Sequence, residues 1–249
     1  MTDPWLYPLL VLAGIVAGAL NVIAGGGSFL TLPILIFMGL PASVANGTNR
    51  VGIFFQNVGA VWGFHRNRLM DWKSILWAAL PASLGAVAGT VLALSIGDAA
   101  FRKVLAFLMI AVTLWTLWDP LGTKGEESRE RGVRLPVLAF GFFLTGIYGG
   151  FVQAGVGFLV LAATTMAGLD LVRGNAVKVL SILAFTVVSL AIFVSQGKVL
   201  WLPGLVLAVG TFVGGQLGVR FTVLKGHAWV KRVVTATIVV FAVKLWVTG

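Results

Sequence analysis

Two short polar clusters interrupt an otherwise apolar chain and are the first candidates for a binding site. Residues 45–50 read Ala-Asn-Gly-Thr-Asn-Arg, and residues 173–178 read Arg-Gly-Asn-Ala-Val-Lys. Polar and ionic groups next to apolar runs are costly to bury and usually face the protein interior or an aqueous path. One interpretation is a helix N-cap with a cation reaching the surface. The other is an anion site built from Asn46, Thr48, Asn49, Arg50, Asn175 and Lys178.

Glycines break the apolar pattern at one point in each half of the chain. Residues 24–28 read Ala-Gly-Gly-Gly-Ser, and residues 153–157 read Gln-Ala-Gly-Val-Gly. Each glycine weakens a helix by about 1 kcal/mol but lets the backbone turn tightly. We expect a tight hairpin turn, a discontinuous helix whose first N–H groups face a substrate anion, or both. The candidate substrate-binding residues here are Gly25, Gly26, Gly27, Ser28 and Gln153.

The sequence offers no group of residues suited to catalysis. All eight carboxylates lie in terminal or loop segments, and cysteine is absent. The two histidines, His65 and His227, lie in polar segments with no nucleophile placed beside them. We therefore expect no catalytic residue, no metal site and no cofactor, and we do not expect an enzyme or an ATP-driven pump.

Composition identifies the environment of the chain. Of its 249 residues, 59% are hydrophobic and 10% are charged, whereas soluble domains are about 45–50% apolar and about 25% charged. Lipid offers no partner for unpaired backbone groups, so helices are the natural way to span it. Residues 76–94 are continuously apolar, which excludes the alternating pattern of a membrane barrel. The prediction is an all-α polytopic membrane protein.

The net charge of +10 fits this environment. In a soluble protein such a charge would suggest nucleic acid. Here the basic residues lie mostly in short loops, where they orient the chain in a cell inner membrane. The expected partners are therefore the lipid bilayer and a small anionic substrate, and no nucleic acid.

The two halves of the chain repeat each other. At an offset of 129 residues, Trp72 matches Trp201, Gly85 and Gly89 match Gly214 and Gly218, and Asn46 matches Asn175. A slip of one residue aligns Arg50 with Lys178 instead. Internal duplication of this kind is common in transporters. We predict a first transmembrane repeat at 1–118, a cytoplasmic linker at 119–134 and a second transmembrane repeat at 135–249.

Each repeat contains about five apolar segments. The second segment of each repeat is short, and the sequence leaves three interpretations of it open. It is a short helix, an arm of a re-entrant hairpin or a continuation of the first segment. The segments lie at 6–24, 29–44, 51–64, 75–96 and 104–118, and at 135–152, 158–171, 177–194, 200–219 and 230–247.

The distribution of basic residues distinguishes these arrangements. If the first two segments form one span, nine Lys and Arg residues fall on each face. If the first two segments instead enter the membrane and return to the same side, 13 of the 18 Lys and Arg residues lie on one face. This is the asymmetry that membrane insertion normally requires. We therefore predict two inverted repeats with glycine-broken short helices. Both termini would lie outside the cytoplasm.

The ordered motifs resemble those of the TauE/SafE family of sulfite and organosulfonate exporters. The resemblance rests on Gly-Gly-Gly-Ser-Phe-Leu-Thr-Leu-Pro at 25–33, Gly-Leu-Pro at 39–41 and the cluster at 45–50. The second half of the chain also resembles the family repeat, at fewer positions. The second half departs from the family pattern at 155–157 and 175–177. The resemblance implies a transporter for a small sulfur-containing anion.

We therefore expect export of a small anion, sulfite or an organosulfonate. The predicted spans contain no carboxylate or histidine for proton coupling. An interior-negative potential drives each negative charge outward by about 2.3 kcal/mol per 100 mV, which favours electrogenic uniport. Two alternatives stay open: a permease importing another small organic anion, and a membrane-embedded enzyme or assembly subunit.

Overall fold

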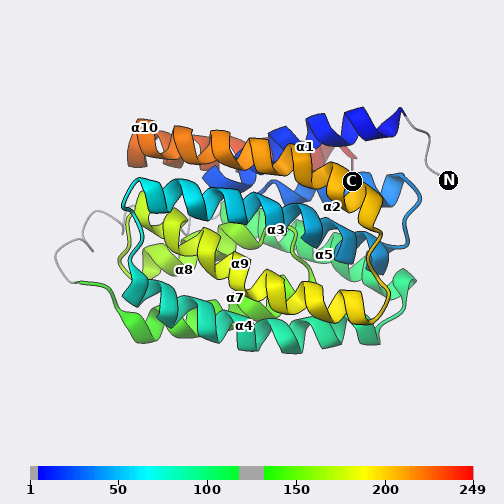
Figure 1. Cartoon of the computed structure of the whole chain (residues 1–249), viewed down its shortest axis with the longest axis horizontal. Coiled ribbons are helices and arrows are strands. Elements are labelled where there is room, and N and C mark those ends of the chain that lie inside the picture. Colours follow the sequence, from blue (N-terminus) through cyan, green and yellow to red (C-terminus); the bar gives the residue numbers. More distant parts are fainter. Residues whose placement is uncertain (1–4, 118–131, 249) are drawn as a thin grey trace.

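The computed structural model describes residues 5–117 and 132–248, and all regular structure in these two ranges is α-helical. Its long helices lie along one common direction (Figure 1). The predicted linker falls almost wholly outside the described residues, because only residues 132–134 belong to it and are described. The helices are α1 (Leu6–Ile23), α2 (Ser28–Phe37), α3 (Ala42–Arg66), α4 (Trp72–Ser95), α5 (Asp98–Leu117), α7 (Leu135–Phe151), α8 (Val156–Met166), α9 (Leu171–Ser195) and α10 (Trp201–Thr248).

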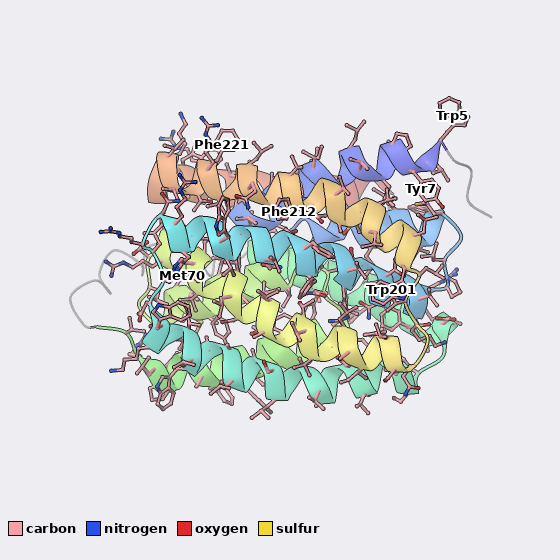
Figure 2. The ribbon with its side chains drawn as sticks, viewed as in Figure 1. Trp5, Tyr7, Met70, Trp201, Phe212 and Phe221 are labelled. Carbon is pink, nitrogen blue, oxygen red and sulfur yellow. The ribbon has the colours of Figure 1, made fainter. Side chains whose placement is uncertain are left out.

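Four of the described helices are long and apolar enough to cross a membrane, namely α1, α4, α9 and the part of α10 from Trp201 to Gly226. Large apolar side chains cover the outer surface, and Leu84 and Leu224 are 69% and 68% exposed. Figure 2 shows Trp5 and Trp201 at one end of the bundle and Phe221 towards the other. Such a surface suits lipid, which supports a polytopic membrane protein.

The two glycine breaks form tight buried turns. The chain leaves α1 through Gly25, at φ +97°, and enters α8 through Gly155, at φ +72°. Residues 21–29 and 149–158 are all buried. Gly27 lies against Ala17 of α1, and the Arg134 N–H at the start of α7 donates to Ala167 at the end of α8. The short second segments are therefore separate helices that fold back along the first.

The two turns also touch each other. A Cβ atom built on Gly25 would lie 2.3 Å from the carbonyl carbon of Gly157. Beside this contact, the rings of Phe29 and Phe158 lie 6.1 Å apart. Glycine is required here because two backbones approach more closely than a side chain allows.

The polar clusters lie inside helices, so their interpretation as N-caps is wrong. The predicted segments 51–64 and 177–194 begin too late, because α3 starts at Ala42 after Pro41 and α9 starts at Leu171 after Asp170. The predicted second segments are likewise too long, since α2 ends at Phe37 and α8 at Met166.

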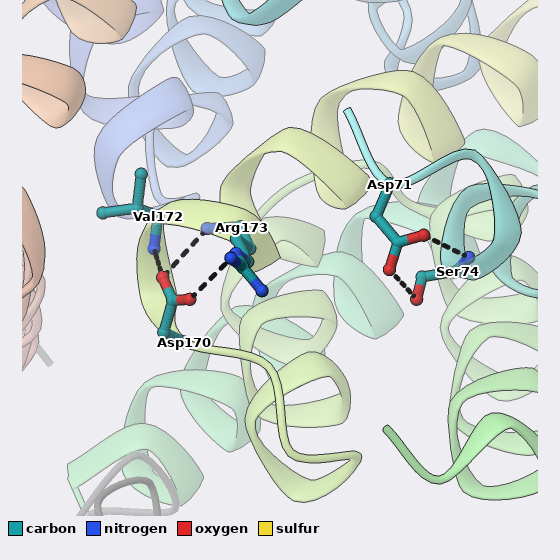
Figure 3. Close-up of polar contacts among 5 residues, drawn as sticks. All are labelled: Asp71, Ser74, Asp170, Val172 and Arg173. Atoms are coloured by element: carbon teal, nitrogen blue, oxygen red, sulfur yellow. Dashed lines mark hydrogen bonds and ion pairs between the residues drawn. The ribbon is translucent and has the colours of Figure 1, made fainter. Parts of the chain in front are cut away.

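The described carboxylates hold helix starts instead of lining the interior. Asp71 accepts from Ser74 at the start of α4, and Asp170 accepts from the N–H groups of Val172 and Arg173 at the start of α9 (Figure 3). Asp98, at the start of α5, accepts the Ser43 N–H at 2.9 Å. That hydrogen bond holds the pKa of the Asp98 carboxyl below its usual range.

Small residues allow the long helices to pack closely, as their four-residue spacing predicts. The helix α1 packs along α10, α4 packs along α7, and α3 contacts both α9 and α10. A Cβ on Gly18 would lie 2.5 Å from the Thr211 carbonyl oxygen, and one on Gly89 would lie 1.9 Å from that of Ile147. The last helix, α10, bends at Gly226, where φ is +70°.

We predict that Gly25→Ala lowers the melting temperature of the detergent-solubilised protein strongly. The left-handed backbone costs about 1–2 kcal/mol for a residue with a Cβ, and overpacking against Gly157 adds about 1–3 kcal/mol. Gly97→Ala is the matched control, because a Cβ at Gly97 meets nothing within 4 Å. Equal melting temperatures for the two variants would contradict the contact between the turns.

Candidate functional site

Arg50 lies on α3 and is completely buried. Its Nη2 donates to the carbonyl oxygens of Gly149 at 3.0 Å and Gly150 at 2.6 Å, near the end of α7. Its guanidinium carbon lies 4.8 Å from the centre of the Phe193 ring, within the range of a cation–π contact. Arg50 therefore joins the first half of the chain to the broken helix of the second.

Lys178 makes the corresponding contact from α9 and is 1% exposed. Its Nζ donates to the carbonyl oxygens of Asn21 at 3.1 Å and Val22 at 2.8 Å, near the end of α1. Lys178 therefore joins the second half of the chain to the broken helix of the first.

An asparagine completes each contact. The amide nitrogen of Asn46 donates to the Phe151 carbonyl at 2.8 Å, and that of Asn175 donates to the Ile23 carbonyl at 3.2 Å. Phe151 and Ile23 are the last residues of α7 and α1. Each broken helix therefore ends on an asparagine and a cation from the opposite half, and we call these two arrangements the crossed caps.

The cations of the crossed caps and the carbonyl groups that they bind repeat at a spacing of 128 residues. Lys178 follows Arg50 by 128 positions, and the acceptors Gly149 and Gly150 follow Asn21 and Val22 by the same number. The one-residue slip that aligns Arg50 with Lys178 is therefore the alignment that matches these contacts, whereas the donors Asn46 and Asn175 lie 129 positions apart.

The electrostatics of the crossed caps are unbalanced. The end of a helix carries roughly half a negative charge, which favours a nearby cation but does not neutralise it. Within residues 5–117 and 132–248, the only ion pair joins Asp170 to Arg173, so Arg50 and Lys178 have no carboxylate partner there. The Nε and Nη1 atoms of Arg50 are also buried without a hydrogen-bond partner among the described residues.

The surroundings of the two cations differ. Next to Arg50, the Thr90 hydroxyl contacts the Gly150 carbonyl at 3.2 Å and Ser189 at 2.9 Å. Next to Lys178, the Asn21 amide donates to Gln56 at 3.1 Å. Besides its asparagine, the Arg50 cap thus has an aromatic ring and two hydroxyls around it, while the Lys178 cap has two further amides.

The predicted site residues fall into two groups. Asn46 and Arg50 lie together at one crossed cap, and Asn175 and Lys178 at the other. Because α3 and α9 run in opposite directions (Figure 1), and Arg50 and Lys178 lie in the first half of each, the two caps lie at different levels along the bundle. The contact between Gly25 and Gly157 connects the two glycine turns between these helix ends.

Three other candidates, Asn49, Gln153 and Thr48, have hydrogen bonds of their own, and a fourth, Ser28, is buried at a helix start. Asn49 accepts from Thr31 of α2 at 2.7 Å, and Gln153 donates to Thr186 of α9 at 2.7 Å. Thr48 accepts the Leu200 N–H, just before α10 begins at Trp201. Ser28 is the first residue of α2 and is buried beside Gly26 and Gly27.

Sequence reasoning missed several polar contacts, namely those of Asn21, Thr90, Thr186 and Ser189. Hydroxyl residues are common in membrane helices and often bond to their own backbone, so their types alone carry little signal. The 128-residue spacing was the available signal for the carbonyl acceptors. Within the described ranges, His, Asp and Glu form no group of three that could hold a metal ion.

Comparison with known proteins identifies the family. The family described as "Sulfite exporter TauE/SafE" matches residues 10–245. The chain belongs to the TauE/SafE family. This match covers every residue of both crossed caps and confirms the resemblance that the sequence motifs indicate.

Relatives with the same extent are known in several bacteria. The chain is 33% identical to a "Probable membrane transporter protein" of Haemophilus influenzae, over 92% of this chain and 90% of the relative. It is 30% identical to "Probable membrane transporter protein ORF9" of Sinorhizobium sp, over 96% of this chain and 92% of the relative. It is 28% identical to "Probable membrane transporter protein YfcA" of Escherichia coli K12, over 98% of this chain and 91% of the relative. No solved structure matches the chain.

We predict that Asn46→Leu and Asn175→Leu each destabilise the protein by about 1–3 kcal/mol, because each leaves a buried helix-end carbonyl unpaired. Thermal unfolding in detergent measures the effect. Asn67→Leu is the control, since Asn67 is exposed and bonds only to Gly63 in its own helix. If either capping variant melted like this control, the crossed cap at that end would contribute nothing to stability.

Proposed function

We propose that this protein exports a small anion, sulfite or an organosulfonate, across the cell inner membrane. The family and the names of its relatives support a membrane transporter. The observation that carries the anionic substrate is the pair of buried cations, Arg50 and Lys178, which no carboxylate of the described residues neutralises.

Arg50 is the group best suited to contact the substrate directly. Its Nη2 serves the carbonyls of α7, while its Nε and Nη1 have no partner among the described residues. A planar guanidinium presents two parallel donors that match two oxygens of an oxyanion. Sulfite and sulfonates carry their charge on such oxygens. The first N–H groups of α2 and α8 would add partial positive charge at the glycine turns.

We propose further that the two halves are inverted repeats that alternate access to this site. The antiparallel course of α3 and α9 (Figure 1) and the reciprocal crossed caps support this arrangement. Because each cap connects one half to the other, a movement between the halves must strain the caps. Substrate oxygens would replace the cap carbonyls as partners of the cation during that movement.

The ends of the described helices support the proposed orientation. The end where α3 meets α4 and α8 meets α9 carries Arg66, Arg68, Lys73 and Arg173. The opposite end, where α4 meets α5 and α9 meets α10, carries Arg102, Lys103 and Lys198. With Arg134, Arg220 and Lys225 on its side as well, the first end would face the cytoplasm.

We predict that Arg50→Gln reduces sulfite efflux from proteoliposomes roughly tenfold to a hundredfold, the loss expected when a charged hydrogen bond is removed. Arg102→Gln is the control, because it makes the same charge change at an exposed residue. Arg50→Lys keeps the charge and should retain more flux than Arg50→Gln at equal melting temperature. Equal flux through the Arg50→Gln and Arg102→Gln variants would exclude Arg50 from the anion site.

We predict that sulfite efflux follows the membrane potential and not the pH gradient. The carboxylates of the described residues, Asp71, Asp98 and Asp170, lie at helix starts, so the described interior offers no acidic group for proton coupling. The measurement is flux in proteoliposomes in which the potential and the pH gradient are set separately. Flux that followed the pH gradient alone would contradict uniport and implicate Lys178 or another coupled ion.

A further inference from the structure

A polar groove lies between α3 and α10, and it is lined by none of the residues that form the crossed caps. It encloses about 310 Å³ between the last turns of α3 and the middle of α10. The side chain of Gln216 on α10 donates to the Gly59 carbonyl of α3 at 2.7 Å, which fixes the two helices together beside the groove. The groove is therefore formed by packed helices and not by loops.

Two arginines give the groove its charge. Arg66 and Arg220 both line it, and both are exposed. The described carboxylates are absent from its lining, and the one ion pair within residues 5–117 and 132–248 lies elsewhere, between Asp170 and Arg173. Two arginines that line one groove without an acidic neighbour are complementary to an anion such as a phosphate.

The other walls of the groove are apolar and open outward. Trp62 is 59% exposed and lies under the Arg66 guanidinium, whose carbon is 5.9 Å from the ring centre. Leu224 closes the groove on α10 and is also largely exposed. Further along the same two helices, Phe55, Val58 and Leu217 continue the exposed apolar surface. A ligand here would meet cations at one end and hydrocarbon at the other.

We propose that this groove binds an anionic phospholipid, with its phosphate between Arg66 and Arg220 and its acyl chains along the exposed faces of α3 and α10. Three features favour a lipid over a free anion. Arg66 is the last residue of α3 and Arg220 lies six positions before the bend of α10 at Gly226, and basic pockets near the ends of membrane helices bind anionic headgroups. An exposed tryptophan, Trp62, lies beside Arg66, and tryptophan is enriched at membrane interfaces. The apolar strip begins where the charged groove ends.

The test is lipid binding by the purified full-length protein, measured by native mass spectrometry. Phosphatidylglycerol and phosphatidylcholine with the same acyl chains are titrated separately. We expect Arg66→Gln/Arg220→Gln to bind phosphatidylglycerol about thirtyfold more weakly, because each cation near an anionic lipid contributes about a factor of five. Binding of phosphatidylcholine should be unchanged.

The matched control is Arg102→Gln/Lys103→Gln, which removes the same charge from exposed residues at the other end of the bundle. It should bind phosphatidylglycerol like the unaltered protein. If the double arginine variant does not purify in folded form, the single variants replace it, each expected to weaken binding about fivefold.

Three outcomes would overturn the proposal. The first is an equal loss of affinity for phosphatidylglycerol in both double variants, which would indicate a general effect of net charge. The second is equal affinity of the unaltered protein for the two lipids. The third is protection from thermal unfolding by inorganic phosphate as strong as that by phosphatidylglycerol, which would identify a free-anion site instead.

Discussion

The ends of α1 and α7 impose the constraint on which the rest of the structure depends. A helix leaves its last four carbonyl groups without partners in its own turn, and a membrane interior supplies no water to satisfy them. Because both helices end in the buried core, donors must come from elsewhere in the protein. The opposite half supplies them through Asn46 and Arg50 at one end and Asn175 and Lys178 at the other. Neither half can therefore satisfy its broken helix alone.

Satisfying these carbonyls with cations has an electrostatic consequence. A neutral donor would complete a helix end without adding charge, whereas Arg50 brings a full positive charge into the core, and Lys178 adds a second when it is protonated. A helix end offsets only roughly half of such a charge. The remaining positive charge makes the core attractive to an anion, so one pair of side chains accounts for both the stability of the broken helices and the proposed substrate chemistry.

Much of this architecture was predictable from the sequence, because glycines and polar residues in an apolar chain have few uses. The glycine turns and the burial of Arg50 and Lys178 followed from that pattern. The sequence did not predict that the two polar clusters lie inside α3 and α9, because Asn46 and Asn175 resemble N-caps when their hydrogen-bond acceptors are unknown. Their acceptors, Phe151 and Ile23, lie 105 and 152 residues away in the sequence. Tertiary partners at such distances leave no trace in local periodicity.

The two crossed caps use different chemistry for the same geometric task. Arg50 cannot lose its proton in a protein and keeps a planar fork of donors, and it lies over Phe193 with Thr90 and Ser189 nearby. Lys178 is a compact point charge among amides. If the proposed halves exchange roles during transport, the two end states cannot have equal energy, because the bond broken at one cap is not the bond broken at the other. Under the proposed mechanism, such an inequality would hold the resting protein in one state and leave the anion to change that balance.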